Sequence, residues 1–396
     1  MLHTPPRLAL CLEYPLGLRG GVSVLVEELI AGLAGDFEIV LVSPDASEVL
    51  ALHPLASRFV GHVMWEPAKV SRATSRALPG RLCELGVVLA HFHCGGSFGW
   101  GMRGIGHCPI PYAAAAGLRC VTTVHRVGGL LEGYCGPAKP WGFKAALLPL
   151  AWLGKMHVLA HTAAEICVSR HNEALLRSRY APLAGRFRMI YHSRLRADEP
   201  PPTAPREAMI LNVGHLAHAK GQHVLVEAFA RVAARHPAWR LQLAGPAVEA
   251  PDLARVREAI ARSGVSERVE LLGGRDDARD LMRTAGIYVQ PSLEEALGLA
   301  LQEALFAGCP AIASDAGGIP ELITDGDNGL LVPRDDLAAL AGALDRLLSD
   351  DALRARLGAR ARPSIAERGM TAAGMIEHHV ALYREVLARE PRAAQP

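Results

Sequence analysis

The sequence predicts an α/β protein built from two doubly wound parallel-sheet domains in tandem, facing each other across a cleft. Three observations predict this fold. Short apolar runs alternate with helical patterns along the 396 residues. Most of these runs are continuously apolar, which is typical of parallel strands covered on both faces. The pattern is interrupted once, at residues 196–207, by a proline-rich polar stretch without periodicity, and then starts again.

This interruption sets the expected domain boundaries. We expect an N-terminal domain at residues 1–195, a linker at 196–208 and a second domain at 209–370. A last helix, at 371–390, is expected to pack back toward the N-terminal domain. A chain of this length is long enough to form two or three domains with cores of their own.

The first half opens with a strand, a glycine-bearing loop and a helix, which is how a doubly wound domain begins. The strand is expected at residues 7–13, the loop contains Gly20 and Gly21, and the apolar face of the helix lies between 22 and 33. Further strands are expected at 38–43, 59–63, 87–93, 119–125, 165–169 and 188–191.

The second half repeats the same alternation. Strands are expected at residues 209–214, 240–245, 269–273, 287–290, 310–314 and 329–332. Helices are expected at 221–236, 252–263, 276–283, 298–307 and 336–348. Because open parallel sheets bind ligands beyond the carboxyl ends of their strands, the loops that follow strands are the candidate binding segments.

Composition excludes several classes of protein. The net charge of +2 gives no electrostatic footprint for nucleic acid. The eight cysteines are scattered without metal-binding spacing, so we expect free thiols in a reducing compartment. The longest apolar run, 145–154, lies between Lys144 and Lys155 and is shorter than the roughly 20 residues of a membrane span. We therefore expect a cytoplasmic protein.

Residues 291–305 are the most informative stretch for function. Glu295 and Glu303 flank the start of a predicted helix near Gly298, with Ser292 as either its N-cap or a turn residue. The N–H groups and dipole of a helix N-terminus suit a phosphate, and glutamates accept hydrogen bonds from hydroxyl groups. Phosphate plus hydroxyls describes a nucleotide sugar. The spacing alone leaves open a simpler interpretation, in which one glutamate is solvated and the other favours the helix dipole.

Two further loops in the second half are marked by residues suited to phosphate. In 214–221, Lys220 lies beside a glycine at a helix start. In 315–321, Gly317 and Gly318 allow positive φ or a close backbone approach. A solvated lysine is the simpler interpretation of the first loop. Three marked loops on one sheet edge favour a binding site.

The first half contains fewer marked positions. The loop with Gly20 and Gly21 follows the first strand, and His125 ends a later strand just before a glycine pair. His91 and His93 end another strand. A single histidine is more often structural, but the position of His125 favours a place in the proposed cleft.

The run at 291–333 resembles the signature region of the retaining glycosyltransferases of family four, which have two Rossmann-like domains in the GT-B arrangement. It contains the strand-ending Pro-Ser, two glutamates eight positions apart, an A-x-G-x-P strand and an S-D-x-G-G-x-P-E turn. The resemblance is close in the second half, looser in the first, and covers nearly the whole chain.

The resemblance implies a role for each marked residue of the second half. Glu303 is expected to bind the nucleotide ribose, Glu295 the hydroxyls of the donor sugar, and Lys220 the diphosphate. The backbone N–H groups expected to meet the diphosphate or sugar belong to Leu297, Gly298 and Leu299. His215 stands where the family usually has an arginine, which would bind the diphosphate together with the lysine.

In the first half, Gly20 and Gly21 are expected to approach the donor phosphate, and His125 to lie beside the donor sugar. The expected catalytic residues are His125, Glu295 and Lys220.

The implied function is a retaining, hexosyltransferase-type glycosyltransferase of polysaccharide biosynthesis. Its donor would be a UDP- or GDP-sugar, and its acceptor a hydroxyl of a glycan, a lipid-linked glycan or a small molecule. The resemblance implies that no cofactor is used and that a metal is not normally needed. The sequence Asp325-Gly326-Asp327 has the form of a metal motif, but Asn328-Gly329 follows it, so we interpret it as a turn.

Several alternatives stay open at this point. The loss of arginine at His215 is compatible with a non-catalytic nucleotide-sugar-binding protein, and a sugar-nucleotide epimerase shares the fold. The run Gly95-Gly96-Ser97-Phe98-Gly99 has the form of a serine-hydrolase elbow, but the glycines after Ser97 are a poor helix start. Residues 141–161 form either a buried helix or a peripheral contact with the inner membrane face.

Overall fold

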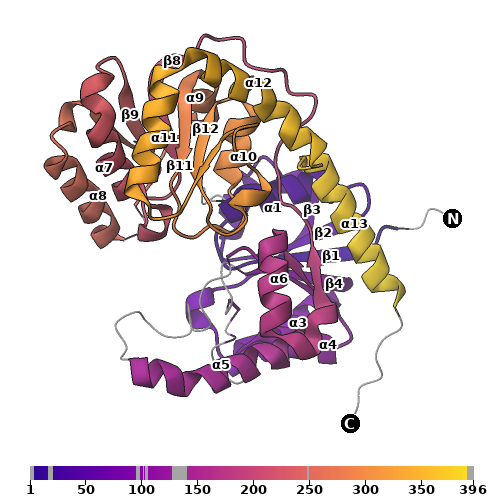
Figure 1. The fold of residues 1–396 in the computed structure, drawn as a ribbon. Coiled ribbons are helices and arrows are strands. Elements are labelled where there is room, and N and C mark those ends of the chain that lie inside the picture. The colour runs from indigo at the N-terminus through magenta and orange to yellow at the C-terminus, as the bar shows by residue number, and fades with distance from the viewer. Residues whose placement is uncertain are drawn as a thin grey trace. The chain divides into compact units, whose positions relative to one another are not determined.

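The computed structural model describes residues 4–16, 21–94, 99–100, 102, 106–126, 141–247 and 249–389. The chain divides into two compact units, each formed around its own β-sheet (Figure 1). Unit 1 comprises Met1–Arg194 and Ala372–Pro396, and unit 2 comprises Leu195–Thr371. The predicted class, two parallel-sheet α/β domains in tandem, is confirmed.

The sheet of unit 1 has seven parallel strands in the order β3-β2-β1-β4-β5-β6-β7. Leu8 of β1 lies opposite Ile39 of β2 on one side and Leu89 of β4 on the other. The strand order therefore reverses at β1, as in a doubly wound sheet. The strands are β1 (Arg7–Leu12), β2 (Glu38–Ser43), β3 (Phe59–Met64), β4 (Val87–Cys94), β5 (Arg119–Val124), β6 (Ala164–Cys167) and β7 (Phe187–Met189).

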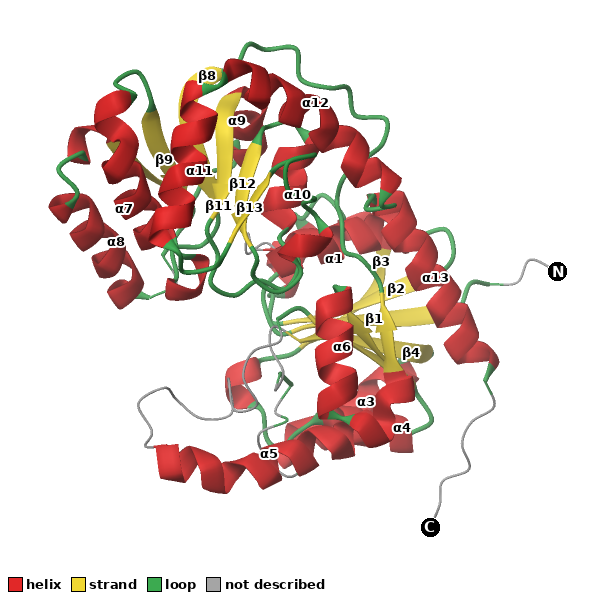
Figure 2. Cartoon of the chain, in the orientation of Figure 1, coloured by secondary structure: helices red, strands yellow, loops and turns green. Residues whose placement is uncertain are grey.

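Helices cover the sheet of unit 1 (Figure 2). The α-helices are α1 (Gly21–Leu33), α2 (Ser47–Ala51), α3 (Arg72–Glu84), α4 (Pro109–Ala115), α5 (Trp141–Ala160), α6 (Arg170–Arg179) and α13 (Ala372–Ala388). Short 3-10 turns are η1 (Ala56–Arg58), η2 (Pro67–Lys69) and η3 (Ala181–Arg186). Helix α3 begins with a capping box, in which Ser71 and Thr74 satisfy each other's backbone N–H groups.

Helix α13 joins unit 1 from the far end of the sequence. It packs against α1 at Gly32, where a Cβ atom would collide with the side chain of Ile376. Further along, the ring of Tyr383 meets Phe37 edge-on, with centroids 5.5 Å apart. Both contacts are apolar, and Phe37 and Tyr383 are buried, so this helix is part of the unit 1 core.

The sheet of unit 2 has six parallel strands in the order β10-β9-β8-β11-β12-β13. Tyr288 of β11 lies between Leu211 of β8 and Ala311 of β12. The strands are β8 (Glu207–Val213), β9 (Arg240–Ala244), β10 (Val269–Gly273), β11 (Ala285–Gln290), β12 (Ala311–Ser314) and β13 (Leu330–Val332). The order reverses between β8 and β11, which makes their carboxyl ends the expected ligand site.

Two helical layers flank this sheet, α7, α8 and α11 on one face and α9, α10 and α12 on the other (Figure 2). The helices are α7 (Gln222–Val232), α8 (Ala250–Arg262), α9 (Ala278–Thr284), α10 (Leu299–Phe306), α11 (Leu337–Ser349) and α12 (Asp351–Glu367). The 3-10 turns are η4 (His218–Lys220), η5 (Ala233–Arg235), η6 (Ser266–Arg268) and η7 (Ile319–Glu321).

Helix α12 is the element of unit 2 that the sequence did not predict. Four arginines and Pro363 obscure its pattern. Its buried residues nevertheless recur every four positions, at Leu353, Leu357, Ala361 and Ile365, and form one apolar stripe.

The structure also bears on the cysteines and on membrane insertion. Seven cysteines lie in the described part of the chain, and all are free thiols, with only Cys83 among them exposed. Within the described residues, none of the helices has the length and apolar character needed to traverse a bilayer.

Candidate functional site

The predicted site residues of unit 2 lie at the carboxyl edge of its sheet. Three loops meet there, after β8, β11 and β12. The backbone N–H groups of Leu293 and Glu294 donate to the carbonyl of Ala219, at 2.8 and 3.1 Å. The N–H of Gly318 reaches the carbonyl of Glu295 at 3.3 Å. Main-chain hydrogen bonds therefore fix the three loops to one another.

Two glycines make this contact possible. Gly221 has φ +67°, and a Cβ atom there would collide with the carbonyl oxygen of Pro291. Gly317 has φ +55°, and its Cβ would collide with the carbonyl oxygen of Glu295. Both positions need glycine for its positive φ and for the close approach of the neighbouring loop.

The carboxylate of Glu295 is held by four donors. Lys220 Nζ lies 2.7 Å from Oε2, which also accepts from Gln290 Nε2 at 3.2 Å and Ser292 Oγ at 3.3 Å. The N–H of Ala296 donates to Oε1 at 3.2 Å. The side chains of Lys220 and Glu295 are 29% and 11% exposed. The lysine and the glutamate that the sequence marked separately thus form one ion pair that remains open to a ligand.

Helix α10 starts at Leu299, directly after these donors. Gly298 precedes it with φ +100°, and Leu297 is buried beside it. The first N–H groups of a helix have no partner within that helix, so this start can donate to an anion. Ser292 lies seven residues upstream and does not cap this helix, so the N-cap interpretation of that residue is wrong.

Glu303 lies on α10, half-buried, one turn into the helix. Burial raises the pKa of the Tyr288 hydroxyl well above its ordinary value, and the negative charges of Glu295 and Glu303 raise it further. Both glutamates are therefore near enough to the buried phenol to act on it by charge.

His215 contributes no full charge to this edge. Burial, and then the positive charge of Lys220, lower the pKa of its imidazole. Its backbone carbonyl accepts from Gln222 Nε2 at 2.9 Å, which ties the loop to α7. At neutral pH the uncharged imidazole ring of His215 is favoured, so of these two side chains Lys220 carries the positive charge.

In unit 1, the structure places His125 directly after β5, half-buried. His125 Nε2 lies 3.0 Å from His93 Nδ1, and the two rings are stacked. Burial, then the imidazoles of His93 and His379, lower the pKa of His125. Gly21 is the first residue of α1, whereas Gly20 and Ser97 lie outside the described residues.

His125 belongs to a larger histidine cluster that the sequence did not predict. Tyr383 OH contacts His91 Nδ1 at 2.6 Å, and Thr123 Oγ1 contacts His91 Nε2 at 2.7 Å. The cluster, as used below, comprises His91, His93, His125, His192 and His379, whose rings lie 4.1–5.8 Å apart from their neighbours. Alternating histidines at 91 and 93 were the available signal. No sequence signal indicated that α13, nearly 300 residues away, would contribute His379 to the cluster and Tyr383 as a contact of His91.

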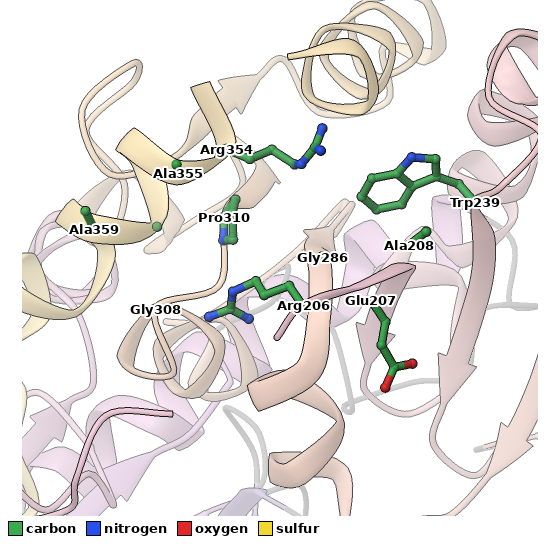
Figure 3. Close-up of a pocket in the computed structure, with 11 residues that line it drawn as sticks. Arg206, Glu207, Ala208, Trp239, Gly286, Gly308, Pro310, Arg354, Ala355 and Ala359 are labelled. Atoms are coloured by element: carbon green, nitrogen blue, oxygen red, sulfur yellow. The ribbon is translucent and has the colours of Figure 1, made fainter. Parts of the chain in front are cut away.

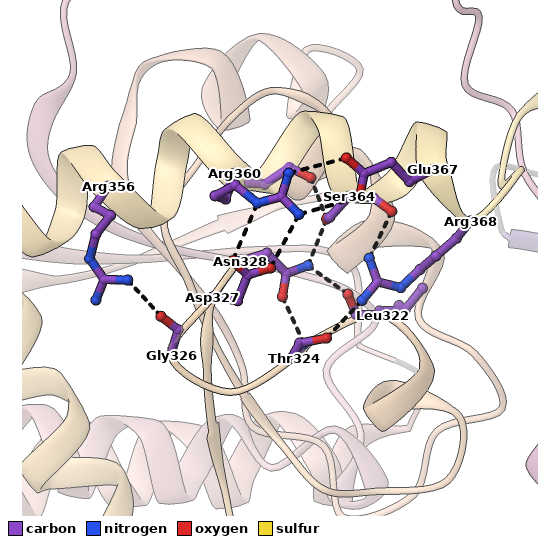
Figure 4. A network of polar contacts seen from close by, with 11 residues as sticks. Leu322, Thr324, Gly326, Asp327, Asn328, Arg356, Arg360, Ser364, Glu367 and Arg368 are labelled. Carbon is purple, nitrogen blue, oxygen red and sulfur yellow. Dashed lines mark hydrogen bonds and ion pairs between the residues drawn. The ribbon is translucent and has the colours of Figure 1, made fainter.

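The sequence Asp325-Gly326-Asp327 forms a turn, as predicted (Figure 4). Asp325 accepts the N–H of Leu331 at 2.9 Å, and Asp327 pairs with Arg360 of α12 at 3.3 Å. Asn328 fixes the turn from inside by donating to Ser364 at 2.7 Å. Both carboxylates thus have structural partners. Across the described residues, no group of three or more His, Cys, Asp or Glu is arranged to hold a metal ion.

A separate pocket of about 580 Å³ lies at the opposite, amino edge of the same sheet (Figure 3). It is lined at the strand starts by Glu207, Gly286, Pro310 and Trp239, with Arg354 from α12. Arg354 lies over the Trp239 ring, 5.0 Å from its centroid. The pocket contains none of the predicted site residues, so it is distinct from the Lys220–Glu295 site.

Two family models match the chain consecutively. Residues 19–193 match the model described as Glycosyltransferase Family 4, and residues 194–363 match Glycosyl transferases group 1. Together they cover residues 19–363, which include most of each unit.

Curated relatives agree with these models. The chain is 29% identical to an N-acetyl-alpha-D-glucosaminyl L-malate synthase of Bacillus anthracis, over 46% of each chain. It is 35% identical to a D-inositol 3-phosphate glycosyltransferase of Nocardia farcinica, over 45% of this chain and 41% of the relative. The matched segment spans at most about half the length of these relatives.

Solved structures share the fold over nearly the whole chain. A glycosyltransferase from Rickettsia africae has a TM-score of 0.75 at 18% identity, covering 98% of this chain and 100% of its own. Anabaena HepE in complex with UDP-glucose has a TM-score of 0.73 at 16% identity, covering 96% and 99%. The two consecutive models, the relatives and the fold lead to one conclusion: the chain belongs to glycosyltransferase family 4 and has the GT-B fold.

Proposed function

We propose that this protein is a retaining glycosyltransferase that moves a sugar from a UDP- or GDP-sugar to a hydroxyl group of an acceptor, without a metal. The observation that carries the proposal is the Lys220–Glu295 pair, held by four donors at the carboxyl edge where β8 and β11 diverge. UDP-glucose is bound by the structural neighbour from Anabaena, which supports a nucleotide-sugar donor.

The chemistry assigns the cationic side of the site to the leaving group. Breaking the sugar–phosphate bond leaves negative charge on the diphosphate and positive character on the sugar. Lys220 and the N–H groups at the start of α10 stabilise the negative charge on the diphosphate, because preorganised donors act most strongly where charge develops. The N–H groups assigned to this task are those of Leu297, Gly298 and Leu299.

The two glutamates divide the hydroxyl groups of the donor between them. Glu295 accepts hydrogen bonds from the sugar, and Glu303 accepts them from the ribose. We expect Glu303→Ala to weaken binding of the nucleoside diphosphate about tenfold, and Glu295→Ala to weaken only the nucleotide sugar by that factor. Isothermal titration with both ligands tests the division. Equal effects of the two variants on the free diphosphate would overturn it.

Unit 1 supplies the remaining assignments, which rest on the family resemblance. Gly20 and Gly21 are assigned to the donor phosphate and His125 to the donor sugar. Because the pKa of His125 is lowered, this ring acts as a neutral hydrogen-bonding partner at pH 7.

The direct test is a panel of UDP-, GDP- and ADP-sugars with two measurements. Thermal shift identifies the base and sugar that bind, and released nucleoside diphosphate measures turnover with an acceptor mixture of glycans and small-molecule alcohols. The proposal predicts turnover that persists in excess EDTA. Loss of turnover with EDTA and its recovery with a divalent cation would contradict metal independence.

A second candidate is a non-catalytic nucleotide-sugar binder. The lowered pKa of His215 favours it, because the site then lacks the second cation over the diphosphate. Such a protein would be stabilised by a nucleotide sugar without releasing nucleotide. An epimerase would change the sugar in the absence of acceptor, which analysis of the recovered nucleotide sugar detects.

Helix α5 supports an acceptor at a membrane surface. Its outer face exposes Leu150 at 44% and Leu153 at 57%, while Lys155 points into unit 1 and is buried. We propose peripheral contact of this face with lipid, with a lipid-linked acceptor. Leu150→Glu/Leu153→Glu should lower cosedimentation with phosphatidylglycerol vesicles, whereas Leu52→Glu, at a residue 88% exposed elsewhere in unit 1, should not. Equal cosedimentation of the wild type, the double variant and Leu52→Glu would contradict the contact.

A further inference from the structure

Strand β11 presents polar side chains to the site from a buried position. Ile287 and Val289 belong to the apolar core of unit 2. Side chains alternate along a strand, so Tyr288 and Gln290 lie on the other face, and Ser292 follows two residues later. These three polar residues are at most 3% exposed. Buried polar groups cost free energy unless they find partners, so their arrangement requires a reason.

Their hydrogen bonds form a chain that ends at Glu295. Tyr288 OH contacts Gln290 Oε1 at 2.7 Å, and Gln290 Nε2 donates to Ser292 Oγ at 2.8 Å. Both Gln290 Nε2 and Ser292 Oγ then donate to Glu295 Oε2.

The direction of this chain follows from charge. A carboxylate only accepts, so the amide of Gln290 must turn its NH₂ group toward Glu295. The amide oxygen then faces Tyr288, whose hydroxyl keeps its proton and lies 2.7 Å from that oxygen, nearer than to its other acceptor, the carbonyl oxygen of Val213, at 3.2 Å. With its oxygen toward Glu295, the same amide would place an acceptor against a negative charge.

We propose that Gln290 is a positioning residue, which holds the carboxylate of Glu295 in the orientation that accepts the hydroxyl groups of the donor sugar. This inference rests on the proposed function of Glu295. Lys220 alone does not fix that orientation, because an ammonium group on a flexible stem is a point charge without directional geometry. A bound diphosphate also competes for Lys220, whereas the buried amide stays available to the carboxylate.

The test compares Gln290→Met, of similar length, with Tyr288→Phe, which removes only the orienting hydroxyl. The matched control is Gln242→Met, because Gln242 makes a comparable amide bond of 3.0 Å to Glu270 in the same sheet. The ligands are the nucleoside diphosphate and the nucleotide sugar that stabilise the wild type most among UDP, GDP, ADP and their glucose and mannose derivatives.

We expect Gln290→Met to weaken binding of the nucleotide sugar about 10-fold to 100-fold and to change diphosphate binding less than about twofold. Tyr288→Phe should give the same pattern at about threefold to tenfold, and Gln242→Met should change neither. A merely structural role would weaken both ligands alike. Equal losses for both ligands, or no loss for either, would overturn the proposal.

A crystal structure of ligand-free Gln290→Met separates this inference from the proposed function. We expect the Glu295 carboxylate to leave its hydrogen bond with Ser292. If it stays in place, Gln290 does not position it, whatever the donor is. If it moves but the wild type binds no nucleotide sugar, the proposed function fails while the positioning role stands.

Discussion

A lysine–glutamate pair of unit 1 and another of unit 2 have nearly equal lengths but opposite surroundings. In unit 1, Lys155 of α5 and Glu165 of β6 lie 2.6 Å apart, and both side chains are fully buried. In unit 2, Lys220 and Glu295 lie 2.7 Å apart and remain partly exposed. Burial by itself lowers the pKa of Lys155, but the charge and hydrogen bond of Glu165, together with the nearby Cys94 and Tyr180, outweigh burial, so the net pKa is raised.

The difference separates a structural pair from the pair to which we assign donor binding. Glu165 accepts from Lys155 and from Thr122 on the same oxygen, and its other oxygen, Oε1, has no hydrogen-bond partner among the described residues. The Glu165 side chain is fully buried. Glu295 uses both oxygens and keeps an open side. Geometry of the pair is therefore a poor guide to its role, and access to solvent together with further donors is a better one.

The largest expected effect comes from breaking the buried pair. Lys155→Met should lower the free energy of unfolding by about 3–5 kcal/mol, because it leaves the charge of Glu165 buried and unpaired. Urea denaturation measures this loss. The control is Lys155→Met/Glu165→Leu, which removes both charges and should recover most of the stability. A single variant within 1 kcal/mol of the wild type would show that the two pairs do not differ as argued.

The matched change in unit 2 should act on activity instead. Lys220→Met should reduce kcat/KM for the donor by about 10²-fold to 10³-fold, the usual range for removing one preorganised donor to a developing charge. Its effect on unfolding should stay near 1 kcal/mol, because the pair is partly solvated. Lys220→Arg retains the charge and should recover part of the activity. A stability loss as large as that of Lys155→Met would remove the distinction.

The charged pairs can be compared with the histidine cluster, whose buried imidazoles are uncharged in the folded protein. Burial lowers the pKa of His379 from its ordinary value near 6.5 to about 4. Between these values the unfolded chain binds a proton that the folded chain does not, so stability is full above pH 6.5 and falls as the pH drops toward 4. Protonation of this histidine alone should lower the free energy of unfolding by about 3 kcal/mol over that pH range.

Urea midpoints measured from pH 7 to pH 4 test this dependence. His379→Met should flatten the curve, because an apolar side chain there takes up no proton in either state. The pKa values of the other cluster members, His91, His93, His125 and His192, are also lowered by burial and by neighbouring imidazoles, so part of the dependence should remain. A midpoint independent of pH would contradict the buried, neutral cluster.

The smallest expected effect concerns the missing second cation of unit 2. His215→Arg restores a permanent charge and a bidentate fork beside Lys220, so donor affinity should increase by a few-fold to about tenfold. Titration with the preferred donor at pH 7.5 measures it. Unchanged or weaker affinity would count against a place for His215 over the diphosphate.

Local patterns predicted most of the fold. The strand at residues 38–43 was predicted with its observed bounds, because a continuous apolar run flanked by turn residues has few other solutions. The strand at 269–273 was also predicted with its observed bounds. Helix α12 was missed because its arginines and Pro363 conceal a stripe that only burial shows. The role of Gln290 was missed for a related reason, since a single polar residue in an apolar strand shows no partner until the chain is folded.

By itself, the sequence determined the alternation of strands and helices, the break between the two units and the glycines that permit close loops. It also marked Lys220, Glu295 and Glu303, because residue type and position after a strand are local properties. Only the tertiary structure decided which groups meet: Glu295 with Gln290 and Lys220, and His91 with Tyr383 of α13. A hydrogen bond needs its two atoms about 3 Å apart in space. The number of residues between two positions does not tell whether their side chains come that close or whether they are buried.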